Sequence, residues 1–279
     1  MKFNNNKRIS LIFGIFLLIT ASLLFIFPAY KLTIPKYHTH DLLSFDNVYV
    51  NGKPTGPDLS KSAFWYGVVE EKDNVLIVKQ SFDVRTLSNK PIFSISRLYG
   101  IDPKTGMHVP GYGDKDREGY LFAPKNFRKQ PFVYWHINYD TPANMNFESE
   151  EKIEGLTVYK YKSVFTADQT KELERLEGVP EKYGINLDVT LTLWIEPATG
   201  SLISYEDHAT AYYYDIETKE RLSKWNEFSN RMTIPMIQKH VTTVRYEKNR
   251  VLLNYIIPAG LSALGILLLA IFFMKRKKR

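Results

Sequence analysis

The sequence has no cysteine, which excludes a fold held together by disulfide bonds. It also has no Asn-x-Ser/Thr tripeptide, the acceptor for N-linked sugars in exported eukaryotic proteins. Exported eukaryotic domains of this size usually carry disulfides. The two absences therefore indicate a prokaryotic surface protein that folds on its hydrophobic core alone.

Charge is missing from two long stretches near the ends of the chain. Ile9–Phe27 is a run of 19 uncharged, mostly apolar residues, and Val251–Met274 is a run of 24. About 20 helical residues, rising about 1.5 Å each, cross a hydrocarbon core that is about 30 Å thick. Both runs are therefore predicted to be transmembrane helices.

Acidic residues are absent from the two tails that flank these runs. The tails hold eight of the 37 lysines and arginines, which leaves 29 basic against 30 acidic residues between them. The net charge of +7 is therefore located in the tails and does not indicate a nucleic-acid partner. Because short basic flanks stay on the cytoplasmic side of a membrane, we expect both termini inside the cell and the middle of the chain outside.

These features divide the chain into a cytoplasmic tail (1–8), a transmembrane helix (9–27), an extracellular β-rich domain (28–250), a second transmembrane helix (251–274) and a basic cytoplasmic tail (275–279). The lipid bilayer is the first expected partner. A cleaved signal peptide is the alternative interpretation of the first run. That run is longer than the usual roughly 7–15 apolar residues, and bulky Phe27 stands where a cleavage site needs a small residue. A retained span is therefore favoured.

Between the two runs the hydrophobic pattern mostly has a period of two, which is typical of half-buried β-strands. We predict a mainly β (α+β) fold, an antiparallel β-rich ectodomain. The segment Leu32–Leu43 is interpreted as a polar stem and Asn51–Pro57 as a loop. Strands are predicted at Asn74–Arg85, Pro91–Tyr99, Phe132–Tyr139, Leu156–Phe165, Leu187–Ile195, Ser201–Tyr214 and Lys224–Thr233.

Two helices are predicted within this ectodomain. Thr166–Glu177 has N-cap candidates at its start and Gly178 at its end, and its charged face predicts a short surface helix. A second helix is predicted from about Pro235 into the last apolar run, as a stalk. A strand at Val241–Tyr246 is the alternative.

One turn motif occurs twice. Ile101–Gly106 (IDPKTG) is repeated 94 residues later as Ile195–Gly200 (IEPATG). Proline presets φ, glycine accepts a left-handed conformation and the acid can accept hydrogen bonds from turn amides. The residues that form these two predicted turns are Asp102, Pro103, Gly106, Glu196, Pro197 and Gly200. Two ordinary hairpins and an ancient duplication both fit the repeat.

The second copy also carries a family resemblance. Ile153–Tyr161 (IEGLTVYKY) followed by Leu193–Leu202 (LWIEPATGSL) resembles a family of two-span prokaryotic envelope proteins of unknown function, often labelled PorA-type porins. Tyr99–Asp102, together with Pro110 and Gly113-Asp114, is similar to its pattern too. The porin label implies a channel, although neither apolar run contains a charged residue to mark an ion path.

The same stretches resemble, more distantly, the class B scavenger receptors. That resemblance implies a β-rich ectodomain between two spans that carries lipids in an apolar tunnel. This chain differs in lacking cysteines and in having a shorter ectodomain, which puts the tunnel in doubt. No catalytic residue is carried over from either family.

Candidate chemical sites are few. His38-x-His40-Asp41 has the spacing of metal ligands on a strand, and Gly111–Asp116 contains acidic residues in a turn-rich loop. Neither reaches the ligand count of a zinc or calcium site, so no metal is expected. Asp207 and His208 point to opposite faces of a strand. Nucleophile elbows and phosphate-binding loops are absent from the sequence, so we expect no enzyme and no cofactor.

The chain is rich in aromatic residues, at 14%. Core packing is one explanation, and the lining of a hydrophobic ligand site is the other, with the alternating faces of Tyr212–Tyr214 as an example. The sequence therefore leaves three hypotheses. The first is an ectodomain that binds or transfers a lipophilic ligand or envelope lipid. The others are a structural or adhesion component, with a homo-oligomer or envelope protein as partner, and a porin-like channel.

Overall fold

The computed structural model describes residues 12–20, 37–50, 52–123, 126, 128–170, 182–251 and 256–277. The chain divides into two compact units. One unit is Thr33–Thr242, called the head below, and the other combines Met1–Leu32 with Thr243–Arg279.

The head is built from one 12-stranded sheet in which every pair of neighbouring strands is antiparallel. The mainly β fold class is thus confirmed. Its strands are β1 (Tyr37–Val50), β2 (Lys53–Pro54), β3 (Asp58–Lys72), β4 (Val75–Thr86), β5 (Pro91–Ile101), β6 (His108–Gly113), β7 (Phe132–His136), β8 (Thr141–Ile153), β9 (Leu156–Asp168), β10 (Tyr183–Ile195), β11 (Leu202–Asp215) and β12 (Arg221–Met232).

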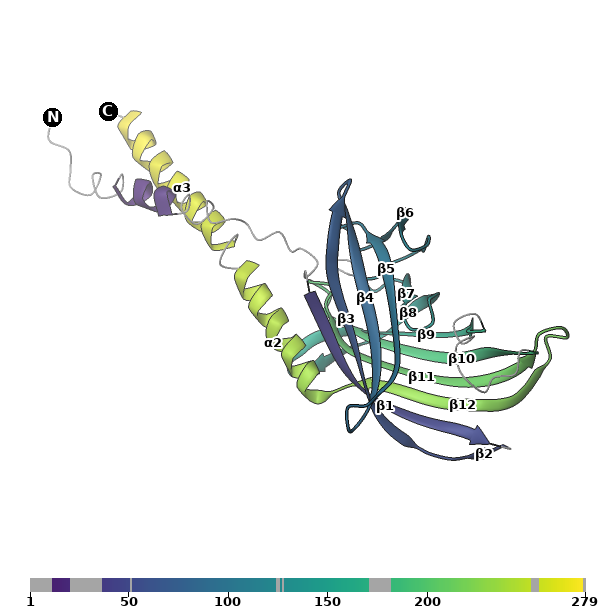
Figure 1. The fold of residues 1–279 in the computed structure, drawn as a ribbon. Coiled ribbons are helices and arrows are strands. Elements are labelled where there is room, and N and C mark those ends of the chain that lie inside the picture. The colour runs from purple at the N-terminus through teal and green to yellow at the C-terminus, as the bar shows by residue number, and fades with distance from the viewer. Residues whose placement is uncertain are drawn as a thin grey trace. The chain divides into compact units, whose positions relative to one another are not determined.

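Two meanders share this sheet. The order is β6-β5-β4-β3-β1-β12-β11-β10-β9-β8-β7, with the short β2 paired to β1. The first meander (β1 and β3–β6) and the second (β7–β12) meet where β1 pairs with β12, with Leu42 opposite Met232. In Figure 1, β3–β5 stand upright while β9–β12 lie across the view, so the sheet turns sharply at this junction.

The outer ends of the two meanders are joined through Tyr120. This residue bridges to Met107 on one side and to Tyr134 of β7 on the other. Its N–H donates to the Val133 carbonyl, and its own carbonyl accepts from Trp135 N–H, both at 2.9 Å. Neighbouring Gly119 has φ +72°, and a Cβ there would lie 2.5 Å from the Val133 oxygen, so only glycine fits. The sheet therefore curls back until its ends are linked.

Side chains on the inner face of this curled sheet form the core. The alternation is clearest in β10, where every second residue from Ile185 to Ile195 is buried. Aromatic rings meet edge to face, as in Phe132 against Tyr161 with centroids 5.2 Å apart. The largest fully buried side chains include Tyr99, Tyr161, Met145, Ile203 and Leu193.

Helices lie outside the sheet. Residues 12–20 are helical, α2 covers Ile234–Val251 and α3 covers Ile257–Lys277. The predicted helix from about Pro235 is confirmed as far as Val251, its continuation through residues 252–255 lies outside the described residues, and the alternative strand at Val241–Tyr246 is wrong. Within the part of the chain that the structure describes, no helix is both long enough and apolar enough to cross a membrane.

Three sequence predictions need correction. The polar stem at Leu32–Leu43 is wrong from residue 37 onward, because β1 begins there and pairs on both sides. The helix predicted at Thr166–Glu177 is wrong at Thr166–Asp168, where β9 still pairs with β10, and residues 171–177 lie outside the described residues. The strand predicted at Phe132–Tyr139 ends at His136, because a tight turn follows.

Candidate functional site

The two copies of the repeated motif form similar turns, between β5 and β6 and between β10 and β11. In the first, Asp102 Oδ1 accepts from the N–H groups of Lys104 and Thr105 at 2.7 and 3.0 Å. The N–H of Gly106 then donates to the Asp102 carbonyl, with a glycine φ of +79°. These backbone hydrogen bonds lower the pKa of Asp102.

The second turn uses a glutamate in the same role. Glu196 Oε2 accepts from Thr199 N–H and from its hydroxyl, both at 2.8 Å, and Gly200 N–H donates to the Glu196 carbonyl. Glu196 is only 1% exposed, whereas Asp102 is half-buried. The residues quoted for the motif thus lie in two structural turns, which set where β6 and β11 begin.

A buried polar network crosses the junction of the two meanders. Asp207 on β11 accepts two hydrogen bonds from Asn230 on β12, the shorter at 2.7 Å, and one from the Tyr139 hydroxyl at 2.8 Å. Asn230 in turn accepts from Ser44 on β1, whose hydroxyl also contacts that of Ser62 on β3 at 2.6 Å. The side chain of Asp207 is fully buried, and burial raises its pKa despite these donors.

His136 joins this network through Tyr205. Its Nε2 lies 3.0 Å from the Tyr205 hydroxyl and 3.9 Å from Asp207 Oδ2, and its ring stacks on Tyr139 at 4.3 Å. The Tyr205 hydroxyl also hydrogen-bonds Asp207, so it links the His136 ring to the buried carboxyl group. Burial, helped by the charge of Arg97, lowers the pKa of His136 to about 3.

Asp207 is the one residue of this network that the sequence analysis considered as a chemical candidate, together with His208. The structure places its neighbours Glu206 and His208 on the exposed face, where His208 Nε2 lies 3.4 Å from Glu227. The hydrogen-bond partners of Asp207 are instead Asn230 on β12, Tyr139 in the turn after β7 and Tyr205 on its own strand. Its role in the structure is to tie β11, β12 and the turn before β8 together.

A second buried charge cluster surrounds Asp140, in the turn between β7 and β8. Its carboxylate lies 3.3 Å from Arg97 Nε on β5 and 2.9 Å from Arg117 Nε, and it also contacts Lys115 Nζ. Trp135 Nε1 donates to it at 2.8 Å. The side chains of Asp140, Arg97 and Arg117 are 5%, 5% and 1% exposed.

Electrostatics hold this cluster in its ionised form. Burial opposes ionisation of Asp140, but hydrogen bonds from Arg117 and Lys115 and the charge of Arg97 outweigh it, lowering its pKa to about 2. The Arg117 guanidinium also lies over the Tyr99 ring at 4.3 Å and bonds Asp114. Because Arg97 and Tyr99 belong to the first meander and Asp140 to the second, the cluster fastens their outer ends together. No local sequence pattern marked Asp140, Arg97 or Arg117.

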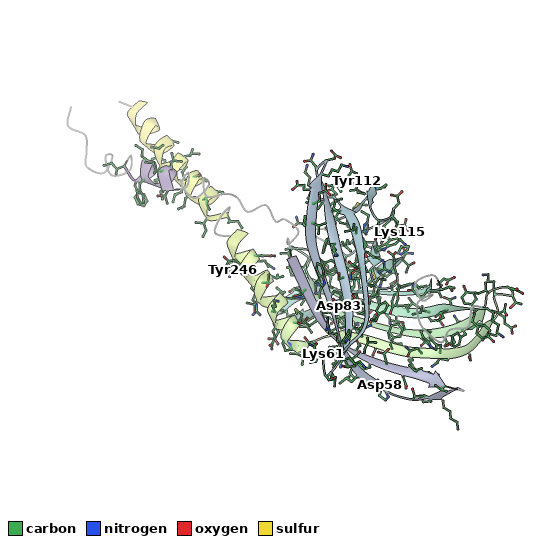
Figure 2. All side chains as sticks on the ribbon, in the orientation of Figure 1. Asp58, Lys61, Asp83, Tyr112, Lys115 and Tyr246 are labelled. Atoms are coloured by element: carbon green, nitrogen blue, oxygen red, sulfur yellow. The ribbon has the colours of Figure 1, made fainter. Side chains whose placement is uncertain are left out.

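The predicted metal candidates are not brought together. His40 is buried on β1 beside His240, while Asp41 is exposed and the side chain of His38 lies outside the described set. In the loop Gly111–Asp116, Asp116 accepts from Gly111 N–H and Asp114 pairs with Arg117. Among the residues that are described, no group of three or more metal-ligating side chains is found. Figure 2 shows Tyr112 near the β3–β4 turn, where its hydroxyl donates to Asp73 at 2.9 Å.

The aromatic residues considered as a ligand lining pack mainly against one another. Tyr213 faces the core beside Tyr183 and Trp225, with ring centroids 5.8 and 5.9 Å away. Tyr212 lies under the Arg221 guanidinium at 4.2 Å, and Tyr214 donates to Asp168 at 2.8 Å. The structure thus gives these aromatic side chains packing and hydrogen-bonding partners within the head.

In the second unit, helix 12–20 and α3 cross at two glycines. A Cβ on Gly14 would lie 3.2 Å from Leu269 and 3.3 Å from the Gly265 oxygen. A Cβ on Gly265 would lie 3.0 Å from Leu18 and 3.1 Å from the Gly14 oxygen. Such close backbone approach requires small residues, as at the interfaces of membrane helices.

The register of this crossing is antiparallel. Gly14 meets Leu269, and moving four residues on to Leu18 moves the contact four residues back to Gly265. Gly14 is five residues after the start of the run Ile9–Phe27, and Leu269 is five residues before the end of Val251–Met274. Residues at equal distances from the outer ends of the two uncharged runs in the sequence are therefore in contact.

Comparison with known proteins gives one result at the level of family. The profile described as "Porin PorA" matches residues 8–274, which is nearly the whole chain. No curated protein matches the sequence. The matched range contains the repeated turns, the whole described head and both uncharged runs. The chain belongs to the PorA porin family.

Proposed function

We propose that this chain is a membrane-anchored envelope protein whose head lies outside the cell, and that several copies assemble to let solutes pass. Two spans, 9–27 and 251–274, would hold the head, with both basic tails in the cytoplasm. The observation that carries the proposal is the extent of the porin family match, which takes in both uncharged runs together with the head.

The strand order of the head fits two tethers on one side of a membrane. β1 is the first strand in the chain and β12 the last, and they are antiparallel neighbours. The chain therefore enters β1 and leaves β12 at the same end of the sheet. This arrangement suits a head that is anchored by two spans in one bilayer.

The helix pair of the second unit fits the same topology. Its antiparallel register brings Gly14 to Leu269, and in the sequence Lys7 and Arg8 precede the first uncharged run while Lys275 follows the second. Basic residues at matched ends favour the cytoplasmic side for both.

We propose that solutes pass between several assembled copies of the chain, because large side chains fill the interior of a single head. Tyr99, Tyr161 and Met145 are each 0% exposed, so passage through the middle of one head would require them to move. A path between copies avoids that cost.

Planar-bilayer recording of the purified full chain tests this function. We expect discrete current steps that require both glycines of the helix crossing. Gly265→Leu should abolish them, because its side chain would collide with Leu18 and Gly14. Gly260→Leu is the matched control, since a Cβ at Gly260 meets nothing within 4 Å. If the wild-type protein inserts into the bilayer and no current steps are recorded, the channel hypothesis is refuted.

Topology can be tested separately, because the chain has no native thiol. Ser88→Cys lies in the exposed turn between β4 and β5, and Asn5→Cys lies in the first tail. A membrane-impermeant maleimide should label Ser88→Cys on intact cells and Asn5→Cys only after lysis. Equal labelling of both before lysis would refute the anchored arrangement.

Binding or transfer of an envelope lipid is the second candidate. The observation that favours it is a group of exposed apolar side chains at one end of the first meander, where pairing of Phe45 with Leu59 and of Ser60 with Thr86 brings strand ends together. The group comprises Val48, Val50, Leu59, Leu87 and Ile92, each 37–58% exposed. Lipid extraction and mass spectrometry of the purified chain should then find a bound lipid. No lipid and no conductance would leave a structural or adhesion role.

A further inference from the structure

Two histidines lie against each other where α2 meets the sheet. The rings of His40 on β1 and His240 on α2 have centroids 4.8 Å apart and planes at 88°. Each residue is only 4% exposed. Both belong to the head, one on its first strand and the other on the helix that follows its last strand.

One aromatic ring packs beside this pair, and a charged residue lies next to each histidine in the sequence. The Tyr66 ring of β3 lies 5.9 Å from His40. On α2 the neighbouring charge is that of Lys239, which is exposed, and on β1 Asp41 is exposed on the opposite face. Burial lowers the pKa of His240, and hydrogen bonds with the backbone of Thr39, Ile203 and Leu202 offset this only in part.

The same contact docks the first turns of α2 on the sheet. Thr233 N–H donates to the Asp41 carbonyl at 3.1 Å, and Ile237 N–H then donates to the Thr233 carbonyl at the start of the helix. Met236 and Val241, which flank His240 on α2, are 5% and 1% exposed. The dock thus consists of apolar side chains and the histidine pair, and the chain continues from it to Val251 and the last uncharged run.

We propose that His40 and His240 form a pH-sensitive latch that holds the first turns of α2 on the head and releases them on acidification. In the neutral state the two rings pack against each other in this buried contact, and His240 also hydrogen-bonds the backbone. A proton on either ring places a charge in a desolvated site, and a second proton places two like charges a few ångströms apart. Undocking exposes the rings to water and removes both penalties.

The direction of the pH effect follows from linkage. In the undocked state His240 takes up its proton near the ordinary pKa of about 6.5, and in the docked state burial lowers the pKa of His240. The undocked form therefore binds more protons below that pH, and docking weakens as pH falls from about 7 to 5. Each unit of pKa difference changes the docking equilibrium by up to about tenfold.

A single cysteine in the otherwise thiol-free full chain can report the dock. Met236→Cys places a thiol at a site that is 5% exposed, so a maleimide should react slowly with it at pH 7.5. Its rate is divided by that of Ser88→Cys, an exposed reference, to cancel the pH dependence of the thiol itself. Between pH 7.5 and 5.5 this ratio should rise about tenfold for the wild-type latch.

Two variants and a core reporter decide the outcome. His240→Phe or His40→Phe should keep the thiol protected at pH 7.5 and flatten the rise. Ala143→Cys, at a site on β8 that is 0% exposed, should stay protected throughout. A flat ratio in the parent, or Ala143→Cys labelling in parallel with Met236→Cys, would overturn the latch. If both phenylalanine variants fail to fold, amide hydrogen exchange in the unaltered chain gives the same comparison between residues 237–241 and β10. We expect acid to speed exchange at residues 237–241 and not in β10. An equal change of the exchange rates in both segments would refute the latch.

Discussion

Replacing Asp140 by asparagine should destabilise the head strongly, because it leaves buried cations without their counter-charge. The asparagine side chain would keep the shape of the aspartate and one acceptor for Trp135. It would lose the charge that faces Arg97, Lys115 and Arg117. Removing one partner of a buried ion pair typically costs about 3–5 kcal/mol of unfolding free energy.

The lower end of that range fits this site, because Lys115 is 48% exposed and can turn to water, whereas the two arginines cannot. We therefore expect a loss of about 3 kcal/mol. For a unit of the size of Thr33–Thr242, this lowers Tm by roughly 6–12 °C. Tryptophan fluorescence during urea unfolding is a suitable assay, since all four tryptophans, Trp65, Trp135, Trp194 and Trp225, lie in the head.

Asp188→Asn is the matched control. Asp188 makes a two-pronged pair with Arg221, both contacts 2.7 Å, but its side chain is 42% exposed and that of Arg221 is 45% exposed. A surface pair of this kind is worth about 0–1 kcal/mol. Equal losses for the two variants, or a loss below about 1 kcal/mol at Asp140, would refute the reasoning, because burial would then have no effect.

The pH profile gives an independent check on the same residue. The folded pKa of Asp140 is lowered to about 2, from an ordinary value of 3.8. Its contribution to stability is therefore fully present above about pH 4 and is lost as pH falls toward 2. Asp140→Asn should lack this component of acid unfolding, so the two proteins should converge in stability at low pH.

Three further predictions follow from local geometry. Burial of neutral His136 should make the free energy of unfolding fall by up to about 1.4 kcal/mol for each pH unit between about pH 6.5 and 3, because only the unfolded chain takes up the proton in this range. Urea titrations at several pH values would show this fall, and a flat profile would contradict it. Gly184→Ala would place a Cβ 2.2 Å from the Tyr214 ring, and we expect a cost of about 1–3 kcal/mol in thermal melts; a Tm unchanged by this variant would mean that the ring can move freely. Glu196→Ala should lower the free energy of unfolding by about 1–3 kcal/mol, because the buried N–H and hydroxyl of Thr199 would lose their acceptor. Asp102→Ala, in the more exposed copy of the turn, should have a smaller effect. The reverse order in paired denaturant titrations would contradict the burial argument.

The strands that the sequence predicted are those with apolar inner faces. β4, β5, β9, β10 and β11 alternate in the ordinary way, so a period of two identifies them. Local turn chemistry likewise identified both copies of the acid-Pro-x-Thr-Gly turn, because all of its hydrogen bonds lie within six residues.

β1 and β3 were not predicted as strands from the sequence because some of their polar residues face the core. Ser44 and His40 on β1 and Ser60 and Ser62 on β3 are buried. A pattern that assigns polar residues to the solvent-facing side of a strand is therefore misleading for these two strands. Their partners Asn230 and His240 lie about 190 residues further along the chain. The cluster around Asp140 was also not predicted. Its partners Arg97 and Arg117 are distant in the sequence, so no local pattern indicates the contact.

The pairing of β1 with β12 sets the time at which the head can be finished. Leu42 pairs with Met232, so the earliest strand to emerge from the ribosome waits for the latest one. At about 5–20 residues per second, the intervening 190 residues take roughly 10–40 s to synthesise. Throughout that interval one edge of β1 is unpaired and open to wrong partners. The head therefore spends most of its synthesis with an open strand edge, which is the period in which it is most exposed to aggregation.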